Sequence, residues 1–114
     1  MARLPRNTYA GRRQQSRAAD AALKLPVNSV APAITGTEQE GATLTCSTGT
    51  WSNTPDAYSY QWNRNGSAIA AATASTYVPV TADVDATLTC TVKATNLGVS
   101  SVATSAATGA IIAA

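Results

Sequence analysis

The chain has 114 residues, with 8 Lys or Arg against 6 Asp or Glu, and it contains neither His nor Phe. This length suits one small domain, and the absence of histidine removes the commonest catalytic base. No stretch approaches the roughly 18 apolar residues of a membrane helix, and the basic first 28 residues lack the apolar run of a secretion signal.

The first 24 residues are strongly basic, whereas the rest of the chain is weakly acidic. Asp20 alone opposes the basic residues of this segment, while residues 25–114 hold two basic residues against five acidic ones. We expect residues 1–27 to form an anchoring arm, extended at first and partly helical over 12–25, because Ala, Gln and Arg favour helices and Pro26 ends one. The basic residues expected to anchor the arm are Arg3, Arg6, Arg12, Arg13, Arg17 and Lys24.

Three roles fit such an arm: docking on a protein assembly, binding nucleic acid, or acting as a solubilising tail. Clustered basic side chains can bind phosphates in a salt-sensitive way. Tyr9 is the only aromatic residue of the arm, however, so stacking on bases has little support. We therefore favour docking on a protein assembly over binding of nucleic acid.

The remaining residues predict a linker, one β-domain and a short tail. Residues 28–32 contain Asn28 and Pro32 and predict the linker, residues 33–108 the domain, and residues 109–114 the apolar tail. Within the domain, short alternating runs rich in Thr and Val are separated by turn residues, as in strands of a sandwich. The predicted strands cover residues 34–37, 42–47, 58–64, 67–70, 75–80, 86–95 and 99–108.

About seven short strands of this kind predict an all-β sandwich preceded by the basic arm. Asn65-Gly66 predicts a two-residue hairpin, because both central positions of that turn need positive φ. Apolar residues at every second position of the strands predict one inward face. The residues expected to form the core are Leu44, Tyr60, Trp62, Leu88 and Val92.

Several segments of residues 33–108 together resemble one known family. They are Ile34–Thr37, Gly41–Cys46, Gly49–Trp51, Tyr58–Gly66, Ile69–Tyr77, Ala82–Val92 and Ala94–Asn96. Taken together they resemble the immunoglobulin-like repeats of bacterial surface proteins and of tailed-bacteriophage virion proteins. The resemblance implies an immunoglobulin-like β-sandwich with the core tryptophan, Trp62, packed across the two cysteines.

Two positions depart from the pattern of that family. The tyrosine corner of the family places a tyrosine two residues before the second cysteine, and Leu88 stands there, so the corner hydrogen bond is missing. Asp85 stands where a glycine is expected. These departures affect the corner and leave the expected fold unchanged.

The resemblance places Cys46 on the second strand and Cys90 on the penultimate one, where the family forms a buried disulfide. We expect that bridge, which closes a loop of about 45 residues and is worth roughly 4 kcal/mol on the loop-entropy model. Two buried free thiols and an intermolecular bridge remain as alternatives. Reduced thiols are expected during synthesis in a cytoplasm, with closure after release.

No metal site, cofactor or catalytic group is expected. Asp83 and Asp85 with Glu38 or Glu40 are too few for calcium, which takes roughly six to eight oxygens, and acids in turns are more often turn formers. Ser and Thr are abundant, but no residue activates them as nucleophiles. The chain is therefore not expected to be an enzyme.

A single such domain with a basic arm resembles small phage head-decoration, neck or tail accessory proteins. The expected function is that of a non-enzymatic virion structural protein, made in the host cytoplasm and located in the virion. Its expected partners are capsid, neck or tail proteins in a symmetric oligomeric assembly, with no membrane. The alternative is a carbohydrate- or host-surface-binding adhesion module, in which loops 52–57 and 96–99 carry the contacts and Trp51 and Tyr58 are aromatic anchors.

Overall fold

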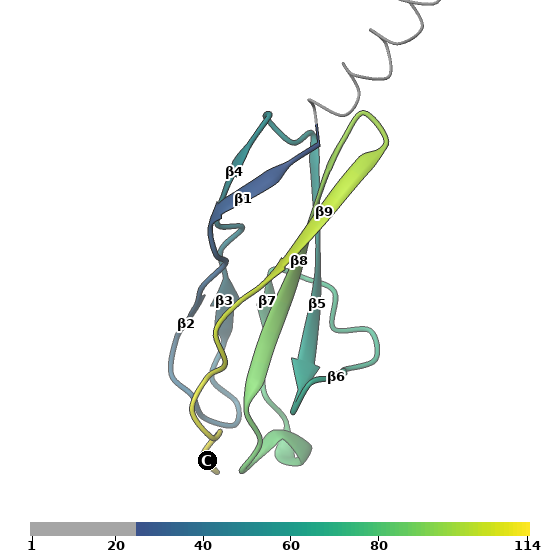
Figure 1. The fold of residues 1–114 in the computed structure, drawn as a ribbon. Coiled ribbons are helices and arrows are strands. Elements are labelled where there is room, and N and C mark those ends of the chain that lie inside the picture. The colour runs from purple at the N-terminus through teal and green to yellow at the C-terminus, as the bar shows by residue number, and fades with distance from the viewer. Residues whose placement is uncertain (1–24) are drawn as a thin grey trace, which may run out of the picture.

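The computed structural model describes residues 25–114, so the predicted arm residues 1–24, with their six basic side chains, lie outside the described residues. The described part is an all-β sandwich, as predicted, with nine strands instead of about seven, and one short 3-10 turn, η1 (Thr81–Asp83) (Figure 1). The strands are β1 (Val27–Val30), β2 (Ile34–Thr35), β3 (Leu44–Cys46), β4 (Thr50–Ser52), β5 (Ala57–Arg64), β6 (Ser67–Ala68), β7 (Thr76–Tyr77), β8 (Leu88–Asn96) and β9 (Val99–Thr104).

The larger layer is an antiparallel sheet of four strands in the order β6-β5-β8-β9. Strand β5 pairs with β8 over eight residues, and Trp62 lies opposite Cys90. The strict alternation of β8, in which Leu88, Cys90, Val92 and Ala94 are all buried, is the pattern that the sequence predicted. Asn65 and Gly66 both have positive φ, 47° and 86°, as the predicted hairpin turn requires.

The second layer contains two small antiparallel sheets, β2-β3-β7 and β1-β4. Strand β1 occupies most of the segment predicted as a linker, because its backbone pairs with β4 and the Asn28 amide donates to the carbonyl oxygens of Val30 and Thr50. Pro26 and Pro32 flank the strand and are both buried. Proline is rare inside strands, so the two prolines that flank β1 made this segment resemble a linker in the sequence.

The last residues of the chain also differ from the prediction of a short tail, because they close the sandwich. Ile111 is fully buried, donates its N–H to Ala86 and accepts from Asp85. Its neighbour Ile112 donates its N–H to the Glu38 carbonyl and accepts from the Glu40 N–H, both on the other layer. Two isolated apolar residues have no periodicity, so this pairing could not be predicted from the sequence.

The core lies between the two layers. Leu44, Trp62, Leu88 and Val92 are fully buried as predicted, and Tyr60 packs against them while partly exposed. The indole of Trp62 stacks on Tyr77 with ring centroids 5.6 Å apart. Its Nε1–H donates to the Ala74 carbonyl. The two cysteines and Ile111 complete this cluster.

None of the helical turns within residues 25–114 has the length and apolar character needed to cross a membrane.

Asp85 has φ of 69°, in the left-handed region, so the backbone there suits glycine. Replacing Asp85 with Gly removes a steric cost of about 1 kcal/mol, which the greater freedom of the unfolded chain offsets in part. We expect Asp85→Gly to raise the free energy of unfolding by about 0.5 kcal/mol in urea titrations. Asp85→Ala should lower it by about 1 kcal/mol, and equal effects of the two variants would contradict the backbone explanation.

Candidate functional site

A buried ion pair fixes the end of the sandwich that lies away from residue 25. The side chain of Asp83 is fully buried, and its Oδ1 accepts from Arg64 Nε at 2.5 Å. Its Oδ2 accepts from the Tyr77 hydroxyl at 2.6 Å and from the Val80 amide at 2.8 Å. Both carboxylate oxygens are thus bound by donors from β5, from β7 and from the residue before η1, which makes Asp83 a structural residue.

The charge state of this cluster follows from its hydrogen bonds. Burial raises the pKa of Asp83, but the bonds from Tyr77, Val80 and Arg64 outweigh it, so the pKa lies below its ordinary value. Burial and the bond to Asp83 raise the pKa of Tyr77 to about 12. The carboxylate is therefore ionised and the phenol neutral across the physiological range.

Asp83 therefore does not join Asp85, Glu38 or Glu40 in a calcium site. The hydroxyl of Thr81 donates to Glu40 Oε2 at 2.5 Å, which occupies a second of these carboxylates. In the described part of the chain, no group of three or more His, Cys, Asp or Glu side chains is arranged to hold a metal ion.

The two cysteines come together in the core, on opposite layers, as the resemblance implied. They are free thiols in this structure, with Cys46 3% and Cys90 0% exposed, so the disulfide stays a prediction. Burial raises the pKa of both thiols. A thiol held protonated and away from solvent reacts slowly, because the thiolate is the reactive form.

The loops expected to carry ligand contacts lie at the end of the sandwich where the described chain begins (Figure 1). The Asn53 amide donates to the carbonyl of Leu25 at 2.8 Å, and the Asn96 amide donates to the carbonyl of Asn53 at 2.7 Å. We call this the N-terminal end of the sandwich. A shallow hollow of about 410 Å³ lies between the two loops, lined by Asn53, Thr54, Asn96 and Leu97.

The two predicted aromatic anchors have different environments. Tyr58 is 40% exposed on β5 and is accessible to a partner. Trp51 packs against the core cluster and donates Nε1–H to the Thr48 carbonyl at 2.6 Å, so its indole is committed to the fold. Only one of the two residues is thus placed as a surface anchor.

Leu97 is the most exposed large apolar residue of the described part, at 66%. It occupies the tip of the β8-β9 hairpin with φ of 51°, followed by Gly98 with φ of 82°. Both values belong to a tight two-residue hairpin turn, a type that ordinarily favours Asn-Gly. A leucine at such a position is unfavourable for the turn and for solvation.

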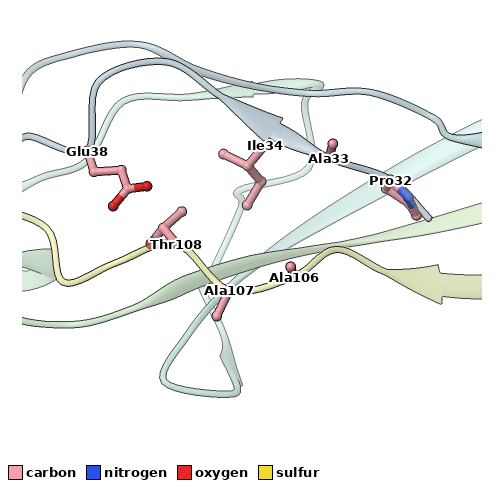
Figure 2. Close-up of a pocket in the computed structure, with 7 residues that line it drawn as sticks. All are labelled: Pro32, Ala33, Ile34, Glu38, Ala106, Ala107 and Thr108. Carbon is pink, nitrogen blue, oxygen red and sulfur yellow. The ribbon is translucent and has the colours of Figure 1, made fainter. Parts of the chain in front are cut away.

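A groove of about 170 Å³ opens between the β2 segment and the residues that follow β9. Figure 2 shows Ile34 pointing from β2 toward the 106–108 segment, with Glu38 and Thr108 at one end and Pro32 at the other. The carboxylate of Glu38 has no hydrogen bond or ion pair with any of residues 25–114. The groove lining is otherwise Pro32, Ala33, Ile34, Ala106, Ala107 and Thr108.

Sequence reasoning missed both the groove and the exposed leucine. The groove is made by small and common residues from two distant segments, and no residue type among them signals a binding site. The leucine could have been noticed, since Leu97 stands in a turn sequence where a polar residue is usual.

Comparison with known families gives one assignment. A family model described as an immunoglobulin domain covers residues 25–106. A search of curated proteins finds no match to this chain.

Removing the hydroxyl of Tyr77 tests the buried ion pair. Tyr77→Phe should lower the free energy of unfolding by about 1–2 kcal/mol at pH 7, because Asp83 loses a donor. Tyr58→Phe, at an exposed tyrosine, is the matched control and should leave it unchanged.

The same ion pair makes stability depend on pH in a defined direction. Because the pKa of Asp83 is lower in the folded state than its unfolded value of about 3.9, its contribution is present above that pH and is lost as pH falls through the folded value. Urea titrations from pH 5 to pH 2 should show this loss, and Tyr77→Phe should make it shallower. An equal acid dependence in both proteins would remove Asp83 from the explanation.

The state of the cysteines can be measured by counting thiols under denaturing, non-reducing conditions. In the reduced native protein both thiols should label slowly, at a rate limited by opening of the core. If the bridge forms after oxidation, the oxidised protein should gain up to about 4 kcal/mol. Cys46→Ser with Cys90→Ser should lose that gain, whereas a covalent oligomer on the gel would place the cysteines at an interface.

Proposed function

We propose that this chain, which belongs to the immunoglobulin domain family and is covered by the family model over residues 25–106, is a structural accessory protein of a tailed-phage virion. In this role the basic arm docks on the assembly, and the domain is displayed or cross-links its neighbours. Capsid decoration, the neck or collar, and the tail are the sites that this proposal includes. The protein would be made in the host cytoplasm and carried in the virion.

The observation that carries the proposal is the separation of charge along the chain. Six of the eight basic residues precede residue 25, and five of the six acidic residues follow it. A basic segment attached to a weakly acidic domain supports docking by the segment on an acidic surface, while the domain is kept off that surface by its own charge.

The junction between arm and domain supports a defined direction of display. Pro26 is buried and its carbonyl accepts from the Ser101 hydroxyl at 2.6 Å, while the Leu25 carbonyl accepts from Asn53. The chain therefore leaves the domain from a point held by two side chains. With the arm docked, the N-terminal end would face the assembly and the opposite end, which carries the C-terminus, would face outward (Figure 1).

The described residues favour a non-enzymatic role. Both carboxylate oxygens of Asp83 accept internal hydrogen bonds, and both thiols are buried and held protonated. The groove beside β2 has a single carboxylate, Glu38, and its other lining residues supply no second titratable group. General acid-base chemistry needs a pair of groups of suitable pKa, and this geometry offers none at either hollow.

The alternative function, a carbohydrate- or host-surface-binding module, is favoured by one observation. The hollow at the N-terminal end is lined by amide and hydroxyl side chains of Asn53, Thr54 and Asn96, the groups that hydrogen-bond sugars. Its position beside the arm junction means that such a ligand would compete with docking of the arm. Binding of glycans by the full chain in an array would favour this alternative.

Charge reversal in the arm tests the proposed docking. Arg12→Glu with Arg13→Glu should reduce incorporation into virions by at least tenfold, counted as copies per particle by mass spectrometry. Lys93→Glu reverses a cation on the domain and is the control, which should leave incorporation within twofold of the wild type. Full incorporation of the double arm variant, or absence of the wild-type chain from purified particles, would contradict the proposal. Affinity for random DNA that falls steeply with salt would instead indicate nucleic-acid binding.

A further inference from the structure

Strand β9 is an outer strand of the four-stranded sheet, and one side of its backbone has no partner strand among residues 25–114. The amide of Ser105 donates to the Cys90 carbonyl, which shows that residues 99, 101, 103 and 105 exchange hydrogen bonds with β8. The N–H and C=O groups of Ser100, Val102 and Thr104 therefore point away from β8. Within residues 25–114 these outward groups have no backbone or side-chain hydrogen bond.

This edge also lacks the features that usually prevent strands from pairing with another chain. Natural edge strands carry charges, prolines or bulges, or are very short. The six residues of β9 include neither a charged residue nor a proline, and Val102 is 64% exposed. The opposite edge of the same sheet is β6, which has only two residues. Among the strands of residues 25–114, β9 is thus the long edge of this sheet that lacks these protective features.

We propose that β9 pairs antiparallel with β9 of a second copy of this chain, which joins the two four-stranded sheets into one continuous sheet. The sequence of β9 is self-complementary in the register that puts Val102 opposite itself. In that register Ser100 lies opposite Thr104 of the copy, and the three outward-pointing residues of each strand pair with each other. The exposed valine is then covered, and the Ser-Thr pairs can form hydrogen bonds across the strands.

The same register explains the exposed leucine at the hairpin tip. Counting along the paired strands from Val102, Leu97 of one copy falls beside Ala106 and Ala107 of the other. Both alanines line the groove next to β2 (Figure 2), whose other lining residues include Pro32 and Ile34. A cavity of about 150 Å³ can hold benzene, so a groove of about 170 Å³ has room for the four carbons of a leucine side chain.

Leu97 is also a costly choice for its position, which supports a role in contact. It holds φ of 51°, where an L-residue with a bulky side chain is strained and Asn or Asp is tolerated. An exposed, strained apolar residue breaks the local rules of the turn, and such departures are expected at functional positions. Insertion of Leu97 into the groove of the second copy accounts for an exposed leucine at this strained position.

Electrostatics permits this arrangement. On the four-stranded sheet, Lys93 lies opposite Val102 on β8, one strand away from the joined edge. Across the proposed axis the two Lys93 residues are separated by three strand spacings, about 14 Å. Charges at that distance are largely screened at physiological ionic strength, where the Debye length is about 8 Å.

The pairing would give the dimer two oppositely directed ends. A two-fold axis between antiparallel strands reverses one copy end for end, so the two N-terminal ends, each with its arm junction, would lie on opposite sides of the dimer. One strand pair and two leucines make a small interface, which suits a weak and concentration-dependent dimer. This inference rests on the domain alone and does not depend on the proposed virion role.

The test is sedimentation of the full-length chain over a range of concentrations. Val102→Pro removes only the outward amide donor, because the amide of residue 102 makes no bond to β8, so the fold should persist while the dimer is lost. Val102→Thr keeps that donor and is the control, with a dimer dissociation constant within threefold of the wild type. An arm variant, Arg12→Glu with Arg13→Glu, should dimerise as the wild type does.

Leu97→Asn should act in opposite directions on stability and on association. Asparagine followed by Gly98 is the favoured pair for this turn, so the melting temperature should stay the same or rise. The dimer dissociation constant should rise at least tenfold, because two leucines leave the interface together. Val78→Asp, at an exposed valine outside the proposed interface, is the control and should leave the constant unchanged.

Cross-linking through introduced cysteines tests the register. Paired residues of antiparallel strands have Cα atoms about 5.5 Å apart, within the range of a disulfide. With added diamide, Val102→Cys should form a covalent dimer, while Ser100→Cys, which lies about four residues from its own copy in this register, should do so at least tenfold more slowly. A wild-type chain that stays monomeric at millimolar concentration, a dimer insensitive to Val102→Pro, or equal cross-linking at the two positions would each overturn the inference.

Discussion

The pairing of β5 with β8 is the constraint on which the rest of the structure depends. These are the two longest strands, and their register sets Trp62 beside Cys90 and Tyr60 beside Val92 on the inner face. Side chains alternate strictly between the faces of a sheet, so a slip of one residue would move the indole from the core to solvent. Strand β3 then packs Leu44 and Cys46 against this face from the other layer.

The ion pair of Asp83 connects the end of β5 to the turn that precedes β8, at the far end of the sandwich. Arg64 is the last residue of β5, and it reaches the carboxylate of Asp83, which precedes the turn into β8. The turn in turn presents Asp85 and Ala86 to the backbone of Ile111, so the last residues of the chain close the sandwich between both layers. Loss of the ion pair would thus weaken both the turn and the closure by the C-terminal residues.

The exposed edge of β9 and the groove beside β2 lie where the C-terminal residues no longer cover the sandwich. The residues after β9 follow β8 through Ser105 and Thr108, and none of residues 25–114 covers the outer edge of β9 or the groove beside β2. The arm junction and the tip of the β8-β9 hairpin lie together at the N-terminal end (Figure 1), as does the hollow lined by Asn53, Thr54, Asn96 and Leu97. The proposed docking of the arm and the proposed pairing of β9 would together let the domain join a surface and a second copy, as an assembly component does.

The sequence by itself determined the inner face of the large sheet, because strand periodicity is local: Leu88, Cys90 and Val92 alternate, and Asn65-Gly66 needs positive φ at both positions. The charge separation of the arm was equally readable, since it is a count along the chain. Only the tertiary structure decided that Asp83 forms a buried ion pair, that Ile111 closes the core and that a groove opens at Ala106, because each depends on a partner distant in sequence. Their residue types are ordinary, and burial, hydrogen bonding and strand edges are properties of the packed chain that no local pattern encodes.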